Sequence, residues 1–143
     1  VISYLRECAS FALSNSSGKI SPSHFSDVNR AYSLRLRQEF VDEMQGAVPE
    51  IEKIFNLLSR MRKQIFSFRE FETQFDRSIR NKELDPDLDF KTICRILFHY
   101  SSIGNQPSQR SAKIFQYIYP NAVINFDERA VIHPGLLQSL QIN

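Results

Sequence analysis

Apolar residues recur at helical spacing through the first 46 residues, and they predict two helices. The first helix covers residues 1–13 and should end in the Ser/Gly-rich stretch 14–19. Ser21 and Pro22 suit the N-cap and the first position of a long second helix that ends near Gly46. The apolar positions of this second helix follow one face: Phe25, Val28, Tyr32, Leu36, Phe40 and Met44. We therefore expect the chain to begin with a helical hairpin.

Two further helices and a short strand follow from the same kind of spacing. Residues 48–61 predict a helix with acidic residues near its start and basic residues at its end, which complements the helix dipole. Residues 63–66 form a short stretch that could be an edge strand. Residues 88–100 predict another helix, whose buried face should include Cys94.

The sequence SFRE at residues 67–70 is the clearest local signal in the chain. A serine at the N-cap can accept a hydrogen bond from a first-turn amide, and a glutamate three residues later can reach back to the amide of the cap. Ser67 and Glu70 therefore predict the start of a helix that ends at residue 80. The buried side of this helix would carry Phe68, Phe71, Phe75 and Ile79.

The C-terminal third is rich in residues that favour strands. β-Branched and aromatic side chains alternate over residues 113–119, which predicts a strand with its aromatic residues on one face. A shorter strand is expected at 130–132, and a short terminal helix over 135–140, opened by a His-Pro pair.

The elements after the hairpin follow the order helix, strand, helix, helix, strand, loop, strand. This is the order of a winged helix-turn-helix, in which a small β-hairpin, the wing, follows a pair of helices. The helix over 67–80 would be the first of the pair, the helix over 88–100 would take the recognition position, and 105–112 would be the wing loop. The sequence thus predicts a mainly α (α+β) fold with two units, a helical hairpin over 1–46 and a winged-helix domain over 47–143.

Residues 97–106, LFHYSSIGNQ, place a histidine beside two serines and raise the question of a catalytic serine. A serine nucleophile needs a base within hydrogen-bond reach and a third group that orients this base. His99, Ser101 and Ser102 are close in sequence only, and no G-x-S-x-G turn surrounds them. We interpret the segment as a helix end, a Ser-Ser turn and a strand in which Gly104 permits a turn into the wing. No catalytic residue and no enzymatic activity are predicted.

The cysteines, histidines and glycines give no metal or cofactor site. Cys8 and Cys94 both lie in apolar helical patterns, which is typical of free buried thiols in a reducing cytoplasm. The histidines at 24, 99 and 133 lack the spacing of metal ligands. Four scattered glycines make no phosphate-binding loop, so we expect no bound ATP or other cofactor. No apolar run reaches the length of a membrane span.

The net charge is only +2, but the charges are unevenly distributed along the chain. Residues 60–82 hold seven basic and three acidic residues, whereas residues 83–90 hold four acidic residues and no basic one. Basic side chains on the helix pair and the wing could neutralise DNA phosphates, so DNA binding is one hypothesis. Its candidate contacts are Arg77, Arg80, Lys82, Lys91, Arg95, Arg110 and Lys113.

Acidic residues before the expected recognition helix favour a different partner. Helix-turn-helix proteins turn the first residues of this helix toward DNA, where carboxylates would repel phosphate. We interpret Asp85 or Asp87 as the N-cap of the helix, and the neighbouring acids as favoured by its positive end. The charge pattern suits a complementary protein surface better than it suits DNA. The candidate partner contacts are Glu83, Asp85, Asp87, Tyr117 and Tyr119.

Three short motifs carry a family resemblance: Ala31-Tyr32-Ser33, Ser102-Ile103-Gly104 and His133-Pro134-Gly135-Leu136. Through them the chain resembles the C-terminal region of bacterial P-loop ATPases that are related to the STAND-type signalling ATPases and often look like phage-defence or stress-response proteins. The resemblance implies a cytoplasmic, non-enzymatic winged-helix module that docks on an ATPase domain of the same chain or on another protein. The hairpin would belong either to this module or to the lid of the ATPase. A start without Met inside a helical pattern fits a piece of a longer protein.

Overall fold

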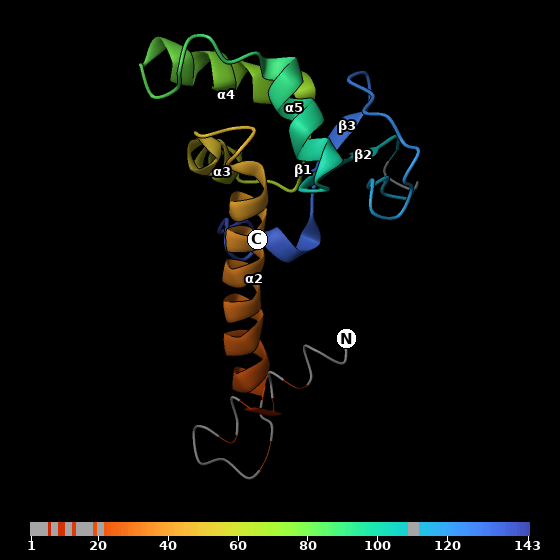
Figure 1. Ribbon diagram of the computed structural model, residues 1–143. Coiled ribbons are helices and arrows are strands. Elements are labelled where there is room, and N and C mark those ends of the chain that lie inside the picture. Colours follow the sequence, from red (N-terminus) through yellow and green to blue (C-terminus); the bar gives the residue numbers. More distant parts are fainter. Residues whose placement is uncertain (1–5, 7–8, 11–12, 14–18, 20–21, 109–111) are drawn as a thin grey trace.

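The computed structural model describes residues 22–108 and 112–143, together with residues 6, 9, 10, 13 and 19 (Figure 1). Within them it shows a helix-rich chain with a three-stranded antiparallel sheet, which confirms the predicted mainly α (α+β) class. The predicted first helix lies almost wholly outside the described residues, so the first arm of the expected hairpin stays a prediction.

α2, Pro22–Met44, is the long second helix that the sequence predicts. At 1.5 Å per residue it extends over about 34 Å. Its C-terminal end packs into the core through Phe40, Val41 and Met44, whereas its N-terminal half extends away from the body of the molecule (Figure 1). Phe25 is accordingly 39% exposed, although it lies on the predicted apolar face. Among the helices of the described residues, none combines the length and the apolar character that crossing a membrane requires.

Three further α-helices are α3 (Ile51–Arg60), α4 (Phe68–Arg80) and α5 (Phe90–His99). The capping box at the start of α4 is confirmed. The Ser67 hydroxyl oxygen accepts a hydrogen bond from the Glu70 amide at 3.1 Å, and the Glu70 carboxylate accepts one from the Ser67 amide at 2.9 Å. Local side-chain chemistry therefore starts this helix where the sequence indicates.

The predicted cap of α5 is wrong. Asp89 caps the helix, because its carboxylate accepts hydrogen bonds from the amide and the hydroxyl of Thr92 at 2.9 and 2.7 Å. The carboxylate of Asp85 instead accepts a hydrogen bond from the Asp87 amide at 2.9 Å, within a turn before the helix. The two hydrogen bonds from Thr92 favour the charged form of the Asp89 carboxylate and lower its pKa.

The sheet consists of β1 (Ile65–Ser67), β2 (Ile103–Gln106) and β3 (Arg129–Ile132). β3 lies in the middle and pairs with both others in antiparallel register. β1 takes an edge position, as predicted. The elements from α3 to β3 thus follow the order on which the winged-helix prediction rests.

The predicted strand over 113–119 is wrong. Only Ile114 pairs with the sheet, through an isolated bridge to Asn105. The following residues form a turn, in which the Tyr119 amide donates to the Phe115 carbonyl at 2.9 Å. Phe115 is buried at 2% exposure while Tyr119 is 46% exposed, so the aromatic residues do not share one face. Packing of Phe115 into the core thus outweighs the alternating pattern.

The predicted wing loop is also too short. Asn105 and Gln106 belong to β2, and the chain between β2 and β3 spans residues 107–128. We call this segment the β2–β3 connection. Its described residues, 107, 108 and 112–128, lie at one side of the molecule, next to the sheet (Figure 1).

Residues 133–142, here called the C-terminal segment, pack between α2 and α3. The expected helix is a 3-10 turn, η1 (Pro134–Leu136), followed by further turns. Its apolar side chains Leu136, Leu140 and Ile142 are buried in the core. The Ser33 hydroxyl of α2 donates to the Gly135 carbonyl at 2.6 Å and accepts from the Ser139 amide at 2.8 Å.

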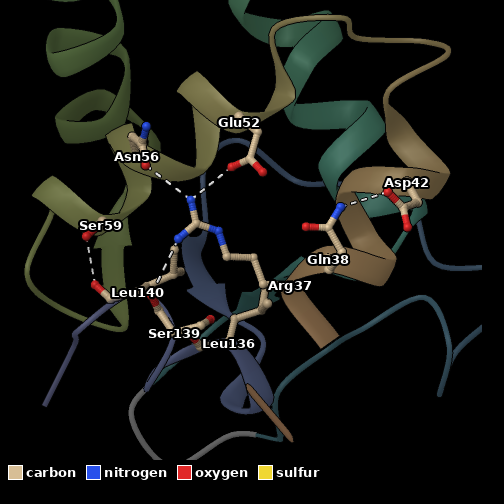
Figure 2. A network of polar contacts seen from close by, with 9 residues as sticks. All are labelled: Arg37, Gln38, Asp42, Glu52, Asn56, Ser59, Leu136, Ser139 and Leu140. Carbon is tan, nitrogen blue, oxygen red and sulfur yellow. Dashed lines mark hydrogen bonds and ion pairs between the residues drawn. The ribbon is translucent and has the colours of Figure 1, made fainter. Parts of the chain in front are cut away.

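A second set of polar contacts joins the same three parts (Figure 2). The guanidinium of Arg37 on α2 donates to Glu52 and Asn56 of α3, each at 3.1 Å, and to the Ser139 carbonyl at 3.5 Å. The Ser59 hydroxyl of α3 donates to the Leu140 carbonyl at 2.7 Å. The C-terminal segment is therefore bonded to both helices.

We expect Ser33→Ala to lower the free energy of unfolding by about 1–3 kcal/mol, because the Ser139 amide and the Gly135 carbonyl lose their shared buried partner. Urea unfolding followed by circular dichroism measures the change. Ser26→Ala on the exposed side of the same helix is the control, and it should have an effect within about 0.5 kcal/mol. Equal stability of the two variants would contradict the structural role of Ser33.

Candidate functional site

The segment LFHYSSIGNQ ends α5 through its two serines. Ser101 has a φ of 63°, in the left-handed region that commonly follows a helix. The amides of Ser101 and Ser102 donate to the carbonyls of Phe98 and Leu97, both at 3.0 Å. The Ser102 hydroxyl is buried and donates to the same Leu97 carbonyl at 2.9 Å. Both serines therefore stabilise the helix end, as the sequence interpretation expects.

The hydroxyl of Ser101 also holds the β2–β3 connection in place. Its oxygen accepts a hydrogen bond from the Tyr117 amide at 3.0 Å. Asn105, which is 1% exposed, holds the same connection at a second point, Asn125. Its side chain donates to the Asn125 carbonyl at 2.8 Å and accepts from the Asn125 amide at 2.9 Å. Two buried polar residues thus fix a long connection at separate points.

Gly104 has a different role from the one that the sequence suggests. It lies within β2 and does not adopt a positive φ, so it is not needed for a turn into the wing. A Cβ at this position would lie 2.4 Å from the Ile114 carbonyl oxygen and 2.8 Å from the Phe115 ring. The glycine therefore permits the close approach of the β2–β3 connection to the sheet.

Large apolar side chains of the β2–β3 connection remain on the surface. Tyr117 is 60% exposed, Ile118 49% and Val123 83%. Beside them lies a hollow of about 620 Å³, here called the apolar hollow, which is lined by Pro107, Ile114, Ile118, Tyr119, Pro120 and Ala122 among others. Exposed apolar side chains grouped around a concavity are typical of binding sites.

A second hollow, of about 460 Å³, lies where α2, the end of α5 and the β2–β3 connection meet. We call it the aromatic hollow, because its lining includes Phe40, Tyr100, Tyr117, His99 and His133. It also contains the carboxylate residue Glu43 of α2. It is thus the more polar of the two hollows.

His133 is held among aromatic rings in the aromatic hollow. Its ring centre lies 5.9 Å from that of Phe40 and 5.6 Å from those of Phe115 and Tyr117. Its Nδ1 accepts a hydrogen bond from the Gly135 amide at 3.0 Å, which starts η1. Burial disfavours the charged imidazolium and lowers the pKa of His133. The imidazole is therefore uncharged at neutral pH.

The described basic residues predicted to contact DNA lie on three different parts of the chain. Lys91 and Arg95 are exposed on one face of α5 and lie over the Phe126 ring, 5.5 and 5.6 Å from its centre. Exposed positions in the last turn of α4 and just after it hold Arg77, Arg80 and Lys82. Lys113 is half-buried at the start of the β2–β3 connection, and Arg110 lies outside the described residues.

The acidic residues predicted to contact a partner have mainly local roles. Glu83 forms an ion pair with Arg60 at 2.6 Å, and its hydrogen bond to the guanidinium lowers its pKa. The Asp85 amide donates to the Glu50 carboxylate at 2.9 Å. Asp87 is exposed and adjoins this turn. The carboxylates of Glu83, Asp85 and Asp89 thus have hydrogen-bond partners within the chain.

Sequence reasoning missed three residues at these sites: Glu43, Phe126 and His133. Glu43 belongs to a mixed charged face of α2, which carries no signal of a hollow. The sequence does hold one signal of the turn that replaces the predicted strand over 113–119. It is Pro120, which interrupts the alternating pattern of that stretch. Of the predicted partner contacts, Tyr117 and Tyr119 are the ones that line hollows.

Cys94 is a buried free thiol whose pKa is raised by burial, while Cys8 lies outside the described residues. In the described residues, no group of three histidine, cysteine or carboxylate side chains could hold a metal ion. A comparison of the chain with family models, curated proteins and solved structures finds no match.

We expect Gly104→Ala to destabilise the protein by about 2 kcal/mol or more, because the added methyl group would overlap the Ile114 carbonyl. Thermal unfolding measures the loss. Gly46→Ala is the matched control, since a Cβ there meets nothing within 4 Å. That variant should be about 0.4–1 kcal/mol more stable than the wild type. A Gly104→Ala protein as stable as the control would contradict the close approach.

We expect the stability of the wild type to fall as the pH drops below about 6.5, the ordinary pKa of histidine. The pKa of His133 is lowered in the folded state, so the unfolded state binds the proton more readily and acid favours unfolding. His133→Asn keeps an acceptor for the Gly135 amide and removes the titration. Denaturant unfolding at pH 7.5 and pH 5.5 should show a smaller loss for the variant, and equal losses would contradict the assignment.

Proposed function

We propose that this chain is a non-enzymatic protein-docking module, and that its docking surface is the β2–β3 connection. The observation that carries the proposal is the set of exposed apolar residues around the apolar hollow, with Ile118 49% and Tyr119 46% exposed. Contiguous apolar surface of this kind loses water favourably when a partner covers it. The anchors at Ser101 and Asn105 support the proposal, because a surface held in place before binding costs less entropy to order.

The partner that we propose follows from the family resemblance alone. It is an ATPase domain of the same longer protein or another protein subunit, on which the module would act as a regulator. The winged-helix assignment and a cytoplasmic setting belong to this proposal. The element order from α3 to β3 supports the first, and the free thiol of Cys94 is consistent with the second.

DNA binding is the second candidate, because Lys91 and Arg95 are exposed on one face of α5. Fluorescence anisotropy with a labelled duplex at low and physiological salt tests it. A Lys91→Glu, Arg95→Glu double variant should then lose binding, and the salt dependence of the wild type should be steep. Under the docking proposal the wild type shows no such binding.

The docking proposal predicts site-specific cross-linking in the natural protein in its own cells. A photoreactive phenylalanine analogue in place of Ile118 should yield a discrete cross-linked protein, because this side chain lines the apolar hollow. The same analogue in place of exposed Arg77 in the last turn of α4 is the control and should yield none. Cross-linking at Arg77 but not at Ile118 would overturn the proposed surface.

A further inference from the structure

A single turn of the β2–β3 connection separates the two hollows. Residues 116–119 form this turn, closed by the bond from the Tyr119 amide to the Phe115 carbonyl at 2.9 Å. Ile118 and Tyr119 line the apolar hollow, whereas Tyr117 lines the aromatic one. Pro120 lines both. The two hollows are therefore adjacent, and one extended peptide could fill them together.

The aromatic hollow has the chemistry of a site for an organic cation. Tyrosine and phenylalanine rings attract a cation through their negative faces when it lies within about 6 Å of the ring centre. Tyr117 lies close to His133, with ring centres 5.6 Å apart, and Tyr100 lies 5.1 Å from His99. Two pairs of rings therefore contribute to the lining of one concavity.

Charge selects a cation over an anion in the aromatic hollow. Glu43 is exposed at its edge, and no residue within the described part of the chain forms an ion pair with it. A carboxylate that lacks an internal partner can pair with a cation from another molecule. His133 does not oppose this, because burial lowers its pKa and leaves the ring uncharged. An anionic ligand would meet the repulsion of Glu43.

We propose that the docking surface binds a peptide segment of the partner that places an apolar side chain in the apolar hollow and a nearby arginine in the aromatic hollow. The inference rests on the proposed docking function and names the chemistry of its partner. Arginine fits better than lysine, since its planar guanidinium stacks on aromatic rings while it bonds to a carboxylate. We therefore predict that the partner sequence holds an apolar residue and an arginine within a few positions of each other, in either order.

The test uses NMR titration of the isotopically labelled chain with two short peptides. One is acetyl-Leu-Gly-Arg-amide, and the other contains citrulline, the uncharged isostere of arginine, in place of the arginine. The arginine peptide should shift the amide signals of Glu43, Tyr100 and Tyr117, and it should bind at least about threefold more tightly than the citrulline peptide. Equal binding of both peptides, or shifts confined to residues 83–87, would overturn the proposed cation site.

Two variants distinguish a specific role of the Glu43 carboxylate from a general effect of negative charge on α2. Glu43→Gln should prefer the arginine peptide less than the wild type does, because the remaining amide carries no charge and only the aromatic rings still favour the cation. Glu39→Gln, one helical turn earlier on α2 and exposed, should keep the preference for arginine. Equal loss of preference in both variants would contradict the assignment to Glu43.

The same titration distinguishes failure of this inference from failure of the docking function. If both peptides shift Ile118 and Tyr119 equally and leave Glu43 unmoved, the apolar surface binds without a cation site, and only the further inference fails. If neither peptide shifts any residue of the two hollows and Ile118 yields no cross-link in cells, the docking function fails as well.

Discussion

The packing of the C-terminal segment between α2 and α3 is the constraint on which the rest of the arrangement depends. β3 leads directly into this segment, and the His133 amide donates to the Ser102 carbonyl at 2.9 Å. Leu136 and Leu140 complete the core, while Ser33 bonds to the Gly135 carbonyl within η1 and to the Ser139 amide after it. The C-terminal end of α2, with Phe40 and Glu43, thereby lies beside His133, whose ring centre is 5.9 Å from that of Phe40. Without this contact the aromatic hollow would lose one of its walls.

The surface that we assign to docking depends on a second set of contacts, made by buried polar atoms. A connection as long as residues 107–128 would ordinarily sample many conformations, and ordering it on binding would cost affinity. Ser101 and Asn105 remove part of that cost, because their side chains hold the amides of Tyr117 and Asn125 in place. Gly104 adds to the effect by letting Ile114 and Phe115 lie directly on the sheet. The helix end and β2 thus shape the surface of the segment that follows them in the sequence.

Local chemistry made much of the fold predictable, and tertiary packing explains what was not. Ser67 and Glu70 cap α4 as expected, because both partners lie within one turn of the chain. The cap of α5 was misplaced by a few residues, since Asp85 and Asp89 are equivalent acceptors until the preceding turn is known. The prediction of a strand over 113–119 was wrong, because strand propensity depends on neighbouring residues in space that the sequence does not show. The aromatic hollow could not be predicted either, because it joins residues from four separate segments of the chain.

The most direct test of the account is amide hydrogen exchange of the intact chain, measured by NMR. The central claim is that the β2–β3 connection is held on the body of the protein before any partner binds. The amides of Tyr117 and Asn125 donate to the side chains of Ser101 and Asn105, and the amide of Ser139 donates to Ser33. All three should exchange at least about a hundredfold more slowly than in an unstructured peptide. Protection of Ser139 with unprotected Tyr117 and Asn125 would mean that the core is as described but that the docking surface is not preformed.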